Sequence, residues 1–145
     1  MHLWIIPLLP LAGFAINGLF GRRLSNRVVS AIAVLTVLMA FVKVLVTLMD
    51  VGAFSGGLEE THVEHYFTWI QSGALNIGVD FAIDRLSAVM LLIVTGIGTL
   101  IHIYAVGYMA HEDGYSRFFA YLNLFMFFML TLVLAQNFLL LFVGW

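Results

Sequence analysis

Two side chains that can gain or lose a proton lie inside long apolar stretches of this sequence, Lys43 and His102. Ionisable groups are costly in a membrane interior, so both positions are candidates for holding or moving protons. The long lysine stem can instead reach toward the headgroups, and Lys43 stands close to an acidic end at Asp50. His102 can equally be a neutral imidazole that bonds a neighbouring helix. Both interpretations stay open for each residue.

Other reactive groups are scarce in the chain. It has no cysteine, which excludes cysteine nucleophiles, disulfides and cysteine-ligated iron–sulfur clusters within these residues. The glycines of VTGIGTLI lack the third glycine of a dinucleotide-binding loop, because Ile101 stands in its place. The net charge of -2, without a long basic run, gives no reason to expect a nucleic-acid partner. We therefore expect no catalytic, cofactor-binding or metal-binding residue in this chain.

The composition is that of a membrane protein. Hydrophobic residues make up 63% of the 145 residues and charged residues 10%, with a mean hydropathy of +1.07. Soluble domains carry about 25% charged residues. The sequence predicts an all-α, polytopic bundle of transmembrane helices that forms a single membrane unit over residues 1–145. Its expected spans are residues 3–20, 28–49, 86–110 and 118–135, with an incomplete fifth span from residue 137.

The segment between the second and third spans predicts a small external β-hairpin over about residues 63–84. LNIGVDFAID alternates apolar and polar residues, which is typical of a half-buried strand, and HYFTWI upstream favours a second strand. The intervening residues 71–74 suit a turn. We expect the apolar face of this hairpin to lie against the outer helix ends or a neighbouring subunit. Asp84 is expected to cap the third span, with Ser87 in its first turn.

Positive charges predict the orientation of the spans. Arginines flank the two short connections at residues 21–27 and 111–117, whereas residues 50–84 carry acidic side chains up to Asp84 and no lysine or arginine. Since positive residues stay on the cytoplasmic side, those two connections are expected to be cytoplasmic. The N-terminus and the 50–84 loop are then outside, in a bacterial inner membrane. Arg85 is the exception, at the external mouth of the third span.

Four stretches carry a resemblance to a known family: DRLSAVM at residues 84–90, VTGIGTLIHIYAVGYM, GYSRFFAYLNLF, and NFLLLFVGW at residues 137–145. Together they resemble the N-terminal part of chain 5, or subunit L, of proton-pumping NADH:quinone oxidoreductase (respiratory complex I). The resemblance is strongest from about Trp69 onward. It implies an antiporter-like, proton-translocating membrane subunit. The positions that match the family as structural residues are Asp84, Ser87, Tyr115, Ser116, Arg117, Asn137 and Trp145.

The same resemblance implies partners and cofactors. Other membrane subunits of complex I and the lipid bilayer would surround this chain, while NADH, FMN, iron–sulfur clusters and quinone would be bound by other subunits. Two positions depart from the family, which often has Asp at Gln136 and sometimes has Gly at Arg85. The change at Gln136 removes a carboxylate from the outer start of the fifth span, which puts in doubt its part in an external proton exit.

The fifth apolar run is short. From Asn137 to Trp145 it covers about 13 Å of a hydrocarbon core of about 30 Å. In the family, a proton-handling glutamate directly follows the Gly-Trp pair, so the resemblance implies an N-terminal fragment truncated before the proton-handling Glu and Lys residues. The alternatives are the large subunit of a multi-subunit Na⁺/H⁺ antiporter, and a small structural or assembly membrane protein.

Overall fold

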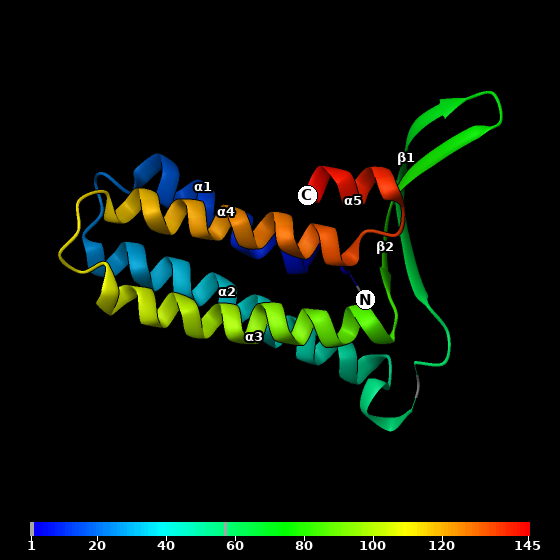
Figure 1. The fold of residues 1–145 in the computed structure, drawn as a ribbon, viewed down its shortest axis with the longest axis horizontal. Helices are drawn as coiled ribbons and strands as arrows, with labels where there is room; N and C mark the ends of the chain where they lie inside the picture. Colours follow the sequence, from blue (N-terminus) through cyan, green and yellow to red (C-terminus); the bar gives the residue numbers. More distant parts are fainter. Residues whose placement is uncertain (1, 57) are drawn as a thin grey trace.

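The structure is a computed structural model that describes residues 2–56 and 58–145. Four helices run side by side along the length of the molecule, and a two-stranded hairpin projects from one end (Figure 1). The long helices are α1 (Ile5–Phe20), α2 (Asn26–Asp50), α3 (Arg85–Tyr108) and α4 (Tyr115–Leu134). The remaining elements are the short helices η1 (Ala53–Ser55) and α5 (Phe138–Gly144) and the strands β1 (His62–Ser72) and β2 (Leu75–Ile83). The predicted membrane helix bundle is confirmed.

Within the described residues, three helices are long and apolar enough to cross a membrane: α2, α3 and α4. Helix α1 has 16 residues and falls short of the expected span over residues 3–20. Helix α4 begins at Tyr115, earlier than expected, because Gly114 turns the chain into it with a φ of 79°. Arg117 therefore lies in the first turn of α4 and not in the connection before it, which corrects the sequence-based placement.

The predicted hairpin is confirmed as an antiparallel pair of β1 and β2. Its turn is tighter than expected: Ser72 pairs with Leu75, and Gly73 closes the turn with a φ of 59°. The pairing slips twice along β1, so the strict alternation predicted for β2 has no regular counterpart there. Only the end of the hairpin near the helices is buried, at Phe81 and Ile83. The apolar face thus meets the helix ends over half of its length, and its outer half projects away from them.

Side-chain caps fix the start of α3, directly after the hairpin, and the start of α5. Asp84 caps α3 as expected, since its carboxylate accepts from the Ser87 backbone N–H at 2.7 Å. Asn137 caps α5 by accepting from the Leu140 N–H at 2.9 Å, and its Nδ2 donates to the Gly78 carbonyl at 2.7 Å. The break expected between the fourth span and the incomplete fifth is present, and α5 folds back along α4 (Figure 1).

Buried apolar side chains form two clusters with polar residues between them. The hairpin-end core joins the helices to β2 and includes Ile6, Leu48, Leu91, Leu134 and Ile83. The far-end core, at the opposite end of the bundle, consists of Val29, Ala33, Ala105, Tyr115 and Phe119. On α2, α3 and α4 alike, the residues between these clusters include buried or half-buried polar side chains. The candidate site lies in this middle layer.

Candidate functional site

His102 is the centre of the polar layer. Its side chain is only 1% exposed, and it lies on the inner side of α3. The ring nitrogen Nδ1 lies 2.7 Å from the Gly98 carbonyl oxygen one turn earlier, and Nε2 lies 2.9 Å from Oδ1 of Asn123 on α4. Asn123 is fully buried. Both nitrogens of the imidazole therefore have a polar partner inside the bundle.

The hydrogen bonds continue from Asn123 to the other two long helices. Its Nδ2 donates to Oγ1 of Thr36 on α2 at 3.2 Å, and the Thr36 hydroxyl donates to the Ala33 carbonyl at 3.0 Å. Helix α1 meets the same point through Gly13, where an added Cβ would stand 2.2 Å from Asn123 Nδ2. We call His102, Asn123 and Thr36 the central polar chain. It crosses the bundle from α3 to α2, and the glycine of α1 makes room for it.

The central polar chain has two complete hydrogen-bonding arrangements that differ by one proton. The Gly98 carbonyl can only accept, so Nδ1 of His102 donates to it. With Asn123 Oδ1 toward the ring, Nε2 must donate too, and the imidazole is then doubly protonated. A neutral ring needs a donor at Nε2, which requires the Asn123 amide to turn and its oxygen to accept from Thr36. The protonation of His102 is thus coupled to the orientation of two other side chains.

Lys43 lies apart from this chain. It is half-buried on α2 and forms no ion pair among the described residues. From Thr36 it is displaced toward the hairpin end by about two helical turns, or about 10 Å along the axis. No described hydrogen bond joins Lys43 to His102. The structure therefore brings His102 together with other polar side chains and leaves Lys43 at a different level of the bundle.

A second polar site ties the start of the chain to the hairpin. The Glu64 carboxylate on β1 accepts from the backbone N–H groups of His2 and Leu3, at 2.9 and 2.8 Å. Tyr66 also donates to Glu64, and its hydroxyl accepts from the Trp4 N–H at 3.2 Å. Helix starts leave backbone N–H groups without partners, and this carboxylate supplies two acceptors there. Glu64 and Tyr66 thus hold the start of α1 against β1.

Protonation of Glu64 is shifted by these contacts. Burial by itself raises the pKa of the carboxyl, but hydrogen bonds from Tyr66, Leu3 and His2 outweigh it and hold the pKa below its ordinary value of 4.5. Burial and the neighbouring Glu64 carboxylate together raise the pKa of the Tyr66 hydroxyl. At neutral pH, Glu64 is therefore an anion and Tyr66 a neutral donor.

Acid is expected to release the N-terminal segment. Because the pKa of Glu64 is lowered on folding, its contribution is present above pH 4.5 and is lost as pH falls through the lowered value. Hydrogen-exchange protection at Leu3 should fall in that range. A Glu64→Gln variant should lose protection at Leu3 roughly severalfold at pH 7 and show no such acid step. The control Glu60→Gln, on the exposed segment before β1, should behave like the wild type; an equal loss would contradict the assignment.

The sequence is similar to that of known membrane subunits. Residues 69–119 match the family described as NADH-ubiquinone oxidoreductase (complex I), chain 5 N-terminus. The NADH-quinone oxidoreductase subunit L of Escherichia coli K12 is 44% identical over 138 residues, which cover 95% of this chain and 22% of that protein. The subunit L of Mycobacterium tuberculosis H37Rv is 43% identical over 144 residues, which cover 99% of this chain and 22% of that protein. The chain is therefore similar to the chain 5 family of complex I. It matches the N-terminal region and spans about a fifth of the length of these relatives.

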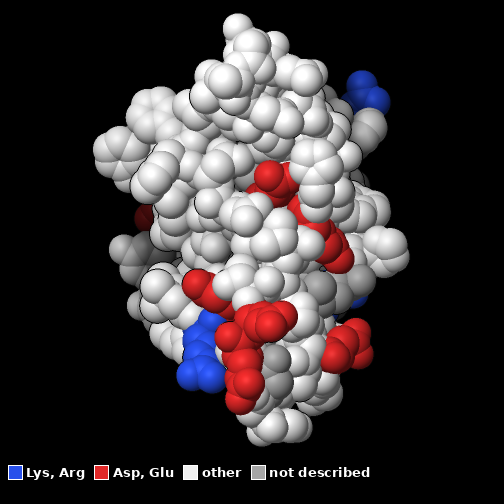
Figure 2. Space-filling model, turned by 90° about the vertical axis from the view of Figure 1, so that its right-hand side faces the viewer, with Lys and Arg blue, Asp and Glu red and all other residues white. Residues whose placement is uncertain are grey.

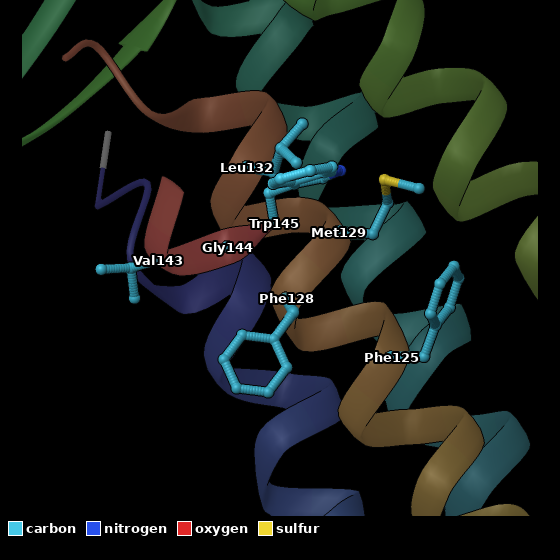
Figure 3. Close-up of a pocket in the computed structure, with 7 residues that line it drawn as sticks. All are labelled: Phe125, Phe128, Met129, Leu132, Val143, Gly144 and Trp145. Atoms are coloured by element: carbon cyan, nitrogen blue, oxygen red, sulfur yellow. The ribbon is translucent and has the colours of Figure 1, made fainter. Parts of the chain in front are cut away.

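The positions expected from the chain 5 resemblance lie at helix ends. Tyr115 is buried in the far-end core, with its ring centroid 4.9 Å from that of Phe119. Ser116 and Arg117 line a groove between α4 and α1. Trp145 is 86% exposed and borders an apolar cavity of about 400 Å³ between α4 and the last turn of α5 (Figure 3). Together with the caps at Asp84, Ser87 and Asn137, these residues border or terminate helices, and none of them is a hydrogen-bond partner of His102.

Three residues that form key hydrogen bonds in the structure were not predicted from the sequence. Asn123 and Thr36 complete the central polar chain, and Glu64 anchors the start of α1. An amide inside a long apolar run was a usable signal for Asn123, because such a group needs a partner in a bilayer. Thr36 gave no comparable signal, since a hydroxyl can bond within its own helix. Among the described residues, no group of three or more His, Cys, Asp or Glu side chains could hold a metal ion.

Proposed function

We propose that this chain forms the N-terminal part of the proton-translocating membrane subunit of NADH:quinone oxidoreductase, where proton transport is coupled to electron transfer from NADH to quinone. The observation that carries the proposal is the similarity to the Escherichia coli subunit L over 95% of this chain at 44% identity. The membrane-length helices α2, α3 and α4 support a role within the bilayer. The other subunits of such a complex would be its partners.

Within that subunit, the chain is proposed to serve mainly as a scaffold. Among the described residues of α2, α3 and α4, Lys43 has no carboxylate partner, so an acid–lysine pair suited to driving protons is missing there. His102 is the group in these helices with linked polar partners. Its two proton arrangements support a local role in passing or sensing a proton. The central polar chain is thus the part of this scaffold that could respond to proton movement.

The redox cofactors are proposed to be bound by other subunits. NADH, FMN, iron–sulfur clusters and quinone would act outside this chain, which itself would carry no catalytic site. The lack of cysteine supports this division for the clusters, which are held by cysteine thiolates in most proteins. The chain would then contribute to the enzyme as a membrane subunit.

Purification of the tagged chain from its native membrane tests the proposed function. In mild detergent, we expect other complex I membrane subunits to copurify and the preparation to oxidise NADH with a quinone acceptor. Untagged membranes carried through the same steps are the control. A preparation that exchanges Na⁺ for H⁺ after reconstitution but does not oxidise NADH would instead favour the antiporter alternative. Recovery of the chain alone would favour a small structural membrane protein.

We also propose the orientation of the chain in a bacterial inner membrane. The N-terminus and residues 50–84 would lie outside, and residues 21–27 and 111–117 would face the cytoplasm. Figure 2 supports this, because acidic side chains gather on the hairpin end of the molecule. At the far end, Arg22 and Arg23 lie in the connection between α1 and α2, Arg27 lies in the first turn of α2, and Arg117 lies in the first turn of α4.

Cysteine labelling in intact cells checks this orientation. A single cysteine replacing Ser72 at the hairpin turn should react with a membrane-impermeant maleimide, since this residue is exposed and expected outside. A cysteine replacing Glu112, in the connection between α3 and α4, should react only after the cells are opened. The reverse pattern would show that the orientation is inverted.

A further inference from the structure

A groove of about 670 Å³ opens between α1 and α4 at the far end of the bundle, away from the hairpin. We call it the arginine groove. Its lining includes two guanidinium groups, two hydroxyl groups and apolar walls, contributed by Arg22, Arg117, Ser116, Tyr121, Phe14 and Leu19. It is distinct from the central polar chain, which lies in the middle of the bundle. The proposed function of the chain makes no use of it.

The charged end of the groove lacks a balancing anion. None of the residues that line it is acidic, and among the described residues neither Arg22 nor Arg117 forms an ion pair. The nearest acidic residues in sequence, Glu112 and Asp113, lie in the connection before α4 and outside the groove lining. Two arginines on facing elements can bind one phosphate between them, because the guanidinium fork matches its oxygens.

A buried amide at the base of the groove also has an unused acceptor. Asn17, which lines the groove, is 2% exposed, and its Nδ2 donates to the Val29 carbonyl at 3.1 Å. Its Oδ1 has no hydrogen-bond partner among the described residues. Buried acceptors are usually satisfied, so this oxygen calls for a donor such as a hydroxyl group. A ligand with both a phosphate and a hydroxyl would match the polar groups here.

The groove changes from charged to apolar along the bundle axis. Arg22 lies just beyond the end of α1, while Leu19 and Phe14 lie progressively deeper on that helix. On α4, Tyr121 lies one turn deeper than Arg117, and both Tyr121 and Leu19 are largely exposed toward the surroundings of the bundle. A free phosphate would use only the charged end of this surface. A phospholipid would place its headgroup at the arginines and an acyl chain along the apolar wall.

We propose that the arginine groove is a binding site for an anionic phospholipid whose phosphate lies between Arg22 and Arg117. Basic pockets between membrane helices are known to receive such headgroups. Phosphatidylglycerol fits the groups present, since its phosphate meets the two arginines and its glycerol hydroxyls are donors for the polar base of the groove. The site would fix the far ends of α1 and α4 to the lipid around them.

Native mass spectrometry of the full chain, released from nanodiscs of defined lipid, tests the proposal. Phosphatidylglycerol and phosphatidylcholine with the same acyl chains are compared. We expect retention of phosphatidylglycerol to exceed that of phosphatidylcholine by about tenfold or more, because each basic side chain near an anionic lipid contributes about fivefold. The Arg22→Gln, Arg117→Gln variant should lose this preference. The control Arg23→Gln, Arg27→Gln removes the same charge from the same end and should keep it.

Several outcomes would overturn the site. Equal retention of the two lipids, or an equal loss in the control variant, would mean that the surface charge and not the groove selects the lipid. Displacement of phosphatidylglycerol by millimolar inorganic phosphate would identify a site for free phosphate. If the double variant fails to fold, the single variants Arg22→Gln and Arg117→Gln decide, since each should lower the preference by about fivefold.

Discussion

Replacing Gly13 with alanine is expected to destabilise the bundle strongly, although the change adds a single methyl group. The new Cβ would stand 2.2 Å from Asn123 Nδ2 and 2.5 Å from Thr36 Oγ1, both below any real contact distance. Helix α1 must move away, or the hydrogen bond between Asn123 and Thr36 must break. Overpacking of this kind costs about 1–3 kcal/mol, and a broken buried hydrogen bond adds to it. Thermal or denaturant unfolding of the chain in detergent measures the loss.

Gly18→Ala on the same helix is the matched control. A Cβ there would meet its nearest neighbour, Cε2 of Phe14, at 3.8 Å, which is an ordinary contact. Alanine favours helix more than glycine by about 1 kcal/mol, so this variant should be neutral or slightly more stable. Equal destabilisation by Gly13→Ala and Gly18→Ala would contradict the close approach of α1 to the central polar chain.

Asn123→Leu is expected to be the most damaging substitution on α4. Leucine has a similar volume, but it leaves Nε2 of His102 without its partner and removes the donor to Thr36. Each buried polar group left without a partner costs about 1–3 kcal/mol. Unfolding in detergent should therefore show a loss of several kcal/mol, together with faster exchange of amides in the middle of α3.

Two comparisons decide whether that loss comes from the polar chain. Thr131→Val, also buried on α4, removes a hydroxyl that bonds only to the Phe127 carbonyl of its own helix, and should cost much less. In a double-mutant cycle, His102→Leu combined with Asn123→Leu should cost less than the sum of the two, with a coupling of about 0.5–3 kcal/mol. Strict additivity would show that the two side chains do not depend on each other.

The sequence predicted the elements of this fold better than their contacts. The lengths of the apolar stretches located the long helices, and the alternation of apolar and polar residues located the hairpin. Each of these signals is local to its own segment. Asn123, Thr36 and Gly13 come from three helices, and their meeting depends on how each helix is rotated about its axis. Two differences from the sequence prediction have local causes: the αL turn at Gly114 moves the start of α4, and the register shifts in β1 leave the alternation of β2 without a regular counterpart.

The candidate site was predicted only in part. His102 was predicted as a candidate because an imidazole in an apolar run is rare. Its hydrogen-bond partner Asn123 was not predicted. Lys43 was an equal candidate from the sequence, but this half-buried side chain on α2 forms no ion pair among the described residues. The anchor at Glu64 could not be found from sequence, since a glutamate in an acidic loop gives no sign that it will accept from backbone N–H groups sixty residues earlier.

The hairpin is held by residues that lie before it and after it in the chain, and this sets an order of assembly. Glu64 bonds the backbone of His2 and Leu3, which exist before the hairpin is made. The carbonyls of Gly78 and Asp80 accept from Asn137 and from the Gln136 N–H, which are made only after α3 and α4. During synthesis from the N-terminus, we therefore expect the hairpin to dock first on α1 and to stay open on its β2 side. The partners of the β2 side follow α4 in the chain, so closure of that side would mark that α3 and α4 are already in place.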